Sequence, residues 1–105
     1  MTFVPVGKVD DLAEGSAKRI EINGVAVCLA RSNGKLYAIN DTCSHADVSL
    51  SEGEVEDGKV ECWLHGSLFD LATGKPLGLP ATRPVPVYAV KTEGDTVLVS
   101  VDEHP

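Results

Sequence analysis

Two short stretches of the sequence each combine a thiol with an imidazole. Residues 43–45 read Cys-Ser-His, and residues 62–65 read Cys-Trp-Leu-His. If the fold brings the two stretches together, they supply two sulfur and two nitrogen ligands. Gly66 follows the second stretch and gives the backbone freedom to curl there. The residue types and their spacing therefore predict a metal centre with mixed cysteine and histidine ligands.

The same four side chains match other sites less well. Structural zinc sites also use two cysteines and two histidines. Zinc fingers, however, pair Cys with Cys and His with His at short spacing, whereas this chain pairs Cys with His twice. A disulfide between Cys43 and Cys62 is compatible only with loss of the metal, and a cytosolic setting disfavours it. The pattern therefore disfavours both alternatives.

The two stretches and their flanks resemble the motif of Rieske proteins. The flanks are residues 36–39 (Leu-Tyr-Ala-Ile), 69–74 (Phe-Asp-Leu-Ala-Thr-Gly) and 78–80 (Gly-Leu-Pro). The resemblance covers nearly the whole chain, whose 105 residues match the size of small Rieske ferredoxins. In a Rieske [2Fe–2S] cluster two histidines replace two cysteines on one iron. The ligands implied for the two irons are Cys43 with Cys62, and His45 with His65.

The resemblance also implies roles for residues around the cluster. Ser67 would donate a hydrogen bond to a sulfur, which stabilises the reduced cluster. From its own position between the second pair of predicted ligands, Trp63 is expected to form an apolar wall over the cluster, with contact to a redox partner as the alternative. The loop at Gly78–Pro80 would cover the cluster, with Pro80 among its contacts.

Three positions depart from the respiratory type of Rieske protein. That type has an additional cysteine in each loop, joined as a disulfide, where this chain has Val48 and Leu64. It also has a sulfur-directed tyrosine where this chain has Phe69. Because fewer donors reach the sulfurs, we expect a low reduction potential.

Short alternating segments separated by turn signals predict an all-β fold. The strands are expected at Thr2–Val6, Lys18–Ile22, Val25–Ala30, Leu36–Ile39, Lys59–Trp63, Arg83–Thr92 and Thr96–Asp102. The turns are expected at 23–24, 32–35, 57–58 and 93–95, and 8–15 is expected to form a turn or one helical turn. The resemblance implies an antiparallel β-sandwich with both ligand loops at one tip.

The remaining cysteine, histidine and acidic residues allow more than one interpretation. Cys28 lies in mid-strand without a nearby ligand, so we interpret it as a core residue rather than a redox group. His104 lies in the tail and is not expected to be a ligand. Residues 44–61 are strongly acidic and predict a solvated hairpin; an acidic flank that orients a partner is the alternative.

Length and charge limit the possible functions. The chain predicts one domain over 1–105, with a cluster-binding region at about 40–82. A net charge of −7 disfavours nucleic acid and anionic membranes as partners but allows a basic docking protein. No apolar run reaches transmembrane length, and the first residues do not resemble a signal peptide, so a cytoplasmic location is expected.

The expected function is electron transfer by a low-potential Rieske ferredoxin. A flavin- and NAD(P)H-dependent reductase would supply the electron, and a Rieske-type oxygenase would accept it. With only three histidines, the chain cannot also hold the mononuclear iron of an oxygenase, so it is not expected to be an enzyme itself. The alternatives are the Rieske-like small subunit of an assimilatory nitrite reductase and a non-redox binding module with a structural metal.

Overall fold

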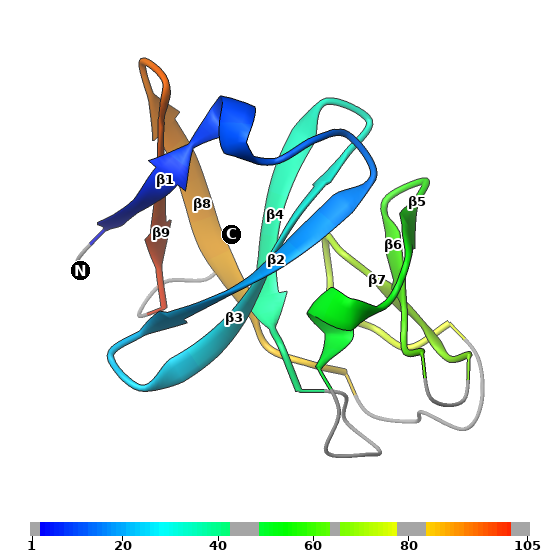
Figure 1. Cartoon of the computed structure of the whole chain (residues 1–105). Helices are drawn as coiled ribbons and strands as arrows, with labels where there is room; N and C mark the ends of the chain where they lie inside the picture. Colours follow the sequence, from blue (N-terminus) through cyan, green and yellow to red (C-terminus); the bar gives the residue numbers. More distant parts are fainter. Residues whose placement is uncertain (1–2, 43–48, 64–65, 78–83, 102–105) are drawn as a thin grey trace.

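The computed structural model describes residues 3–42, 49–63, 66–77 and 84–101, which form two antiparallel sheets. The larger sheet has the strand order β1-β9-β8-β4-β3-β2, and the smaller has the order β5-β6-β7. The smaller sheet lies to one side of the larger one (Figure 1). This arrangement confirms the all-β antiparallel fold. The predicted position of the ligand loops at one tip rests partly on residues outside those described.

The elements of the larger sheet come from both ends of the chain. They are β1 (Val4–Lys8), β2 (Ser16–Ile22), β3 (Val25–Ser32), β4 (Lys35–Asn40), β8 (Val87–Glu93) and β9 (Thr96–Ser100). The smaller sheet consists of β5 (Val55–Glu56), β6 (Lys59–Glu61) and β7 (Leu68–Asp70). Two short 3₁₀ helices, η1 (Val9–Asp11) and η2 (Leu50–Glu52), connect the strands. None of the described helices is long and apolar enough to cross a membrane.

Three hairpins form where Asn-Gly and Asp-Gly pairs predict them. The φ angles are 51° and 82° at positions 23 and 24, 54° and 76° at 33 and 34, and 51° and 74° at 57 and 58. Positive φ at both central residues defines the turn whose twist matches the flanking strands. These turns set the pairing of β2 with β3, β3 with β4 and β5 with β6.

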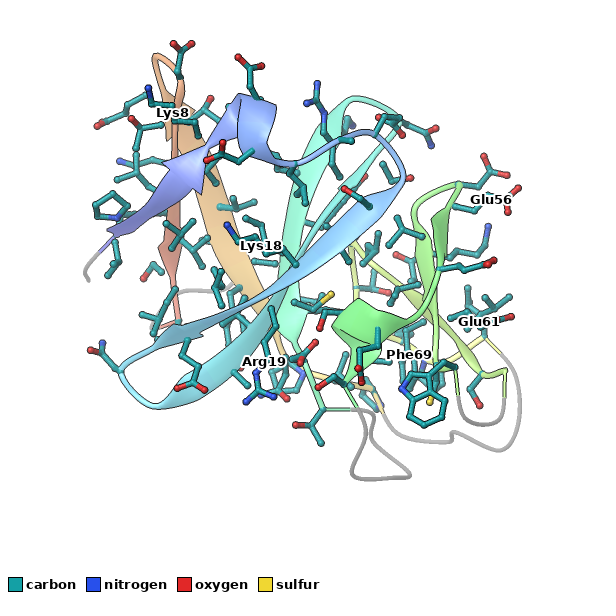
Figure 2. All side chains as sticks on the ribbon, viewed as in Figure 1. Lys8, Lys18, Arg19, Glu56, Glu61 and Phe69 are labelled. Atoms are coloured by element: carbon teal, nitrogen blue, oxygen red, sulfur yellow. The ribbon has the colours of Figure 1, made fainter. Side chains whose placement is uncertain are left out.

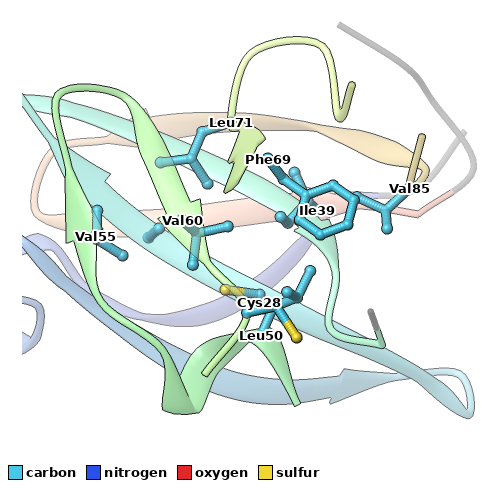
Figure 3. Close-up of a cluster of buried hydrophobic side chains, with 10 residues drawn as sticks. Cys28, Ile39, Leu50, Val55, Val60, Phe69, Leu71 and Val85 are labelled. Atoms are coloured by element: carbon cyan, nitrogen blue, oxygen red, sulfur yellow. The ribbon is translucent and has the colours of Figure 1, made fainter. Parts of the chain in front are cut away.

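Strand β3 is buried on both faces, and its alternation divides the interior into two clusters. Val27 and Leu29 join one cluster with strands β8 and β9. Cys28 and Ala30 join the other, which lies between the two sheets (Figure 3). The predicted faces of β3 and the predicted core position of Cys28 are thus confirmed. The second cluster also contains residues next to the ligand loops, so packing between the sheets positions the site.

Some predicted strand bounds were wrong. Strand β8 begins at Val87 and not at residue 83, because Pro84 and Pro86 lack the N–H that a ladder needs. Strand β1 extends to Lys8, beyond the predicted end at Val6. Its position at the sheet edge is as predicted, and an irregularity in its pairing with β9 follows Pro5.

Candidate metal centre

The segments that carry the predicted ligands are closed at their bases by backbone hydrogen bonds. Thr42 pairs with Ser49 across residues 43–48. In the second stretch the Cys62 N–H donates to the Ser67 carbonyl at 2.7 Å, and the Gly66 N–H donates to the Cys62 carbonyl at 2.8 Å. Gly66 has a φ of 75°, a conformation that L side chains adopt at a cost. The described residues on either side of both stretches are therefore held together by backbone pairing.

Cys62 is the predicted ligand that the described residues include. It directly follows β6, which ends at Glu61 and not at the predicted Trp63, and its free thiol is buried with a relative exposure of 0%. Cys43, His45 and His65 lie outside the described residues, as does Pro80. Within the described ranges no three acidic, cysteine or histidine side chains gather as a metal site would require. A buried free thiol at the base of a tight loop is nevertheless the donor that an iron–sulfur cluster needs.

The segment that follows the first loop packs directly against the strand that leads into the second. Leu50, in η2, is fully buried in the group of core residues between the two sheets, to which Cys62 also belongs. Gly53 ends η2, and a Cβ built on it would overlap the carbonyl group of Glu61. The backbone of the segment after the first loop thus touches the backbone of β6. The contact is at Glu61, the residue that precedes Cys62. This close approach requires glycine.

Asp41 ties the two ends of the first loop together from a buried position. Its carbonyl accepts from the Leu50 N–H at 2.6 Å, and its Oδ1 accepts from the Ser51 N–H at 2.8 Å. Its Oδ2 lies 3.9 Å from Nε of Arg19, and its side chain is only 1% exposed. Arg19 also donates to Ser49 Oγ at 3.5 Å, and Figure 2 shows it beside η2. Asp41 and Arg19 therefore connect both sides of the loop.

We expect Asp41→Ala to lower the free energy of unfolding by about 2 kcal/mol, because the Ser51 N–H loses its acceptor in a partly buried place. Asp41→Asn keeps an acceptor oxygen of the same shape and should cost less than half as much. Urea unfolding of the three proteins tests this. Equal stability of the alanine and asparagine variants would show that the Ser51 hydrogen bond does not hold the loop.

Three further residues flank Cys62 in the folded chain. Phe69, in β7, is fully buried in the group of core residues between the two sheets, which also contains Cys62. Ser67 is also buried, and its carbonyl accepts the hydrogen bond from Cys62. Trp63 is 50% exposed, which favours the contact role over the wall role. The structure thus places Phe69 and Ser67 where they can affect the site.

Cys28 belongs to the same group of buried core residues as Cys62 but is less suited to bind a metal. It lies in the middle of β3 and is fully buried. Burial, assisted by the negative charge of Asp41, raises the pKa of the Cys28 thiol far above its ordinary value. Metal binding requires a thiolate, so these surroundings disfavour Cys28 as a ligand.

Sequence reasoning missed Asp41 and Gly53. The only signal for Asp41 was its acidic side chain two positions before a predicted ligand. The only signal for Gly53 was its place as a glycine in an acidic segment. Both act through backbone groups that the fold alone brings near.

The chain is similar to ferredoxins of bacterial oxygenase systems. The 3-phenylpropionate/cinnamic acid dioxygenase ferredoxin subunit of Escherichia coli (strain K12) is 47% identical over 96 residues, which is 90% of each chain. The ferredoxin component of biphenyl 2,3-dioxygenase from Rhodococcus jostii (strain RHA1) is 42% identical over 102 residues, covering 97% of this chain and 95% of that protein.

A solved structure and a family match agree with these relatives. A chain in the complex of reduced oxygenase and oxidized ferredoxin in carbazole 1,9a-dioxygenase matches with a TM-score of 0.90 and 32% identity, covering 98% of this chain and 95% of that one. The Rieske [2Fe-2S] domain matches residues 2–89. The buried thiol of Cys62 at the base of a tight loop fits such a cluster. The chain therefore belongs to the Rieske [2Fe-2S] domain family, and its cofactor is a Rieske-type [2Fe–2S] cluster.

Proposed function

We propose that the chain is a low-potential Rieske ferredoxin that carries single electrons from a flavin- and NAD(P)H-dependent reductase to a ring-hydroxylating Rieske oxygenase. The observation that carries this proposal is the 47% identity, over 90% of both chains, to a dioxygenase ferredoxin subunit. The protein would be the electron-transfer component of that system and not its catalytic enzyme. The names of the relatives support this role over that of a nitrite reductase small subunit.

The proposed cluster ligands are Cys43, His45, Cys62 and His65. Support comes from the buried thiol of Cys62 and from the hydrogen bonds that close both loops. When bound, the cluster would supply one-electron chemistry, with two of its ligands histidine and two cysteine. The chain's own part is to join the two ends of the first loop through Asp41 and to bring the segment after it against β6 through Gly53.

We further propose that residues 1–105 form one domain, with a cluster-binding region at about 40–82, and that the protein is cytoplasmic. The first statement is supported by β1, which pairs with β9 and so joins the two ends of the chain in one sheet. The second is supported by the free thiol of Cys28, which is not a proposed ligand.

Reconstitution tests the function. The purified chain is combined with the reductase and terminal oxygenase of the 3-phenylpropionate or biphenyl dioxygenase, NADH and the aromatic substrate. We expect hydroxylated product that depends on the added chain and is absent when the cluster has been removed. A chain that holds its cluster yet supports no turnover in either system would argue against the proposal.

The reduction potential should lie near the lower end of the range of Rieske centres, roughly −150 to +300 mV. Phe69 is fully buried in the same group of core residues as Cys62 and stands where the respiratory type has its sulfur-directed tyrosine, so the test is whether a hydroxyl there donates to a ligand sulfur. We expect Phe69→Tyr to raise the potential by roughly 40 mV, which corresponds to a hydrogen bond of about 1 kcal/mol gained on reduction. Protein-film voltammetry at one pH measures the shift.

A matched control for that substitution is Tyr37→Phe, which removes a hydroxyl from a partly buried ring packed against the same cluster of residues. Its potential should equal that of the wild type. A wild-type potential well above zero, or no shift in Phe69→Tyr, would contradict the assignment of low potential to missing sulfur-directed donors.

A further inference from the structure

Three large apolar side chains are exposed in the described part of the chain, and all belong to the region of the second loop. Trp63 is 50% exposed, Leu77 49% and Leu68 37%. Trp63 follows the predicted ligand Cys62, and Leu68 follows Ser67, which closes the loop. Single exposed apolar residues are ordinary, but a group of them on one small area is typical of an interaction site.

Strand pairing brings Leu68 and Leu77 together. The Leu77 N–H donates to the Leu68 carbonyl at 2.7 Å, and the neighbouring Phe69 pairs with Pro76. On its other side Leu68 pairs with Glu61 of β6. Side chains opposite each other in a ladder lie on the same face, so Leu68 shares the outer face of the small sheet with Glu61. The inner face carries the buried residues Val60 and Phe69.

The same outer face carries a strong negative charge. A shallow pocket there is lined by Leu68 and by charged residues of the β5–β6 hairpin, namely Glu54, Glu56, Asp57, Lys59 and Glu61. Figure 2 shows Glu56 and Glu61 pointing away from the molecule on the same side of this sheet. A small apolar area with an acidic border is complementary to a partner face with an apolar centre and a basic rim.

We propose that Trp63, Leu68 and Leu77, together with the acidic border at Glu54, Glu56 and Glu61, form the docking surface for the terminal oxygenase. The surface begins one residue from Cys62, so a partner bound there lies next to the proposed cluster site. The complementary oxygenase face carries lysine or arginine around an apolar centre. Charged borders steer the encounter, and apolar centres hold the complex, so the two parts have separable effects.

The oxygenase is the occupant that the comparisons favour. One matching solved chain, with a TM-score of 0.90, comes from a complex of an oxygenase with a ferredoxin. This inference rests on the proposed function, because a chain that does not feed an oxygenase needs no such surface. The reductase is the other candidate occupant, and the experiment includes it as a competing outcome.

The test measures the dissociation constant between the oxidised, cluster-loaded chain and the oxygenase that supports turnover, by titration calorimetry at two salt concentrations. Leu68→Ser with Leu77→Ser should raise the constant at least about tenfold, as should Trp63→Ala. Glu54→Gln with Glu56→Gln should raise it at low salt and much less at high salt. The visible spectrum of each variant confirms that the cluster is retained.

The matched control for the charge variant is Asp10→Asn with Asp95→Asn. It removes the same charge from exposed positions in η1 and the β8–β9 turn, on the other side of the molecule from the small sheet (Figure 1). It should bind the oxygenase like the wild type. An unchanged dissociation constant in the leucine and tryptophan variants would overturn this inference, as would a rise seen only with the reductase. In either case, turnover by the wild type would leave the proposed function intact. Failure of the wild type with every oxygenase tested would overturn both.

Discussion

Replacing Gly53 by alanine is expected to lower the free energy of unfolding by about 3 kcal/mol and to reduce the iron content of the purified protein. The new Cβ would overlap the carbonyl group of Glu61, which is backbone and cannot rotate away as a flexible side chain could. The segment after the first loop must then move off β6. Because Cys62 directly follows β6, this movement separates the proposed cysteine ligands. Urea unfolding and iron analysis measure the two effects.

Gly58→Ala is the matched control for that substitution. Gly58 has a φ of 74°, so alanine there is strained, but its Cβ would meet no heavy atom within 4 Å. We expect a cost of about 1 kcal/mol from the backbone conformation and a full iron content. If Gly53→Ala were no less stable than Gly58→Ala and held as much iron, the contact between the two ligand-bearing segments would not position the site.

Much of the fold could be predicted because local chemistry determines it. The Asn-Gly and Asp-Gly pairs require positive φ and therefore form the hairpin turns, and the alternation of Val25 to Ala30 matches a strand buried on both faces. The start of β8 could not be predicted from apolar content, since the ladder begins only after Pro86. Which sheet each strand joins also depends on contacts distant in the sequence, such as β1 with β9.

A site residue can be proposed from the sequence where its own chemistry points to a role, and not where only its position does. Cys62 could be proposed as a ligand because thiols and imidazoles in this spacing point to a metal. Asp41 could not, because its role depends on the N–H groups of Leu50 and Ser51, which the fold brings back to it. The exposure of Trp63 likewise depends on the loop geometry and not on the residue type.

Cys62→Ser is expected to reduce iron and acid-labile sulfide from about two each per chain to nearly none, because a serine hydroxyl does not replace a cluster thiolate. Elemental analysis, the sulfide assay and the visible spectrum measure this loss. Zinc at one per chain in the wild type, with no sulfide, would contradict the cluster assignment itself.

Cys28→Ser is the matched control, because both cysteines are free, fully buried and part of one core cluster. Each serine places a hydroxyl in an apolar environment at a cost of about 1–3 kcal/mol, so both variants should lose similar stability without the cluster. They should differ in iron. Cys28 lies inside β3, with a thiol pKa raised by burial, whereas Cys62 opens the loop that the Ser67 carbonyl closes. Both variants pay the same cost for burying a hydroxyl, so that cost cannot make their iron contents differ. Loss of iron in a folded Cys28→Ser protein would therefore show that Cys28 takes part in holding the cluster.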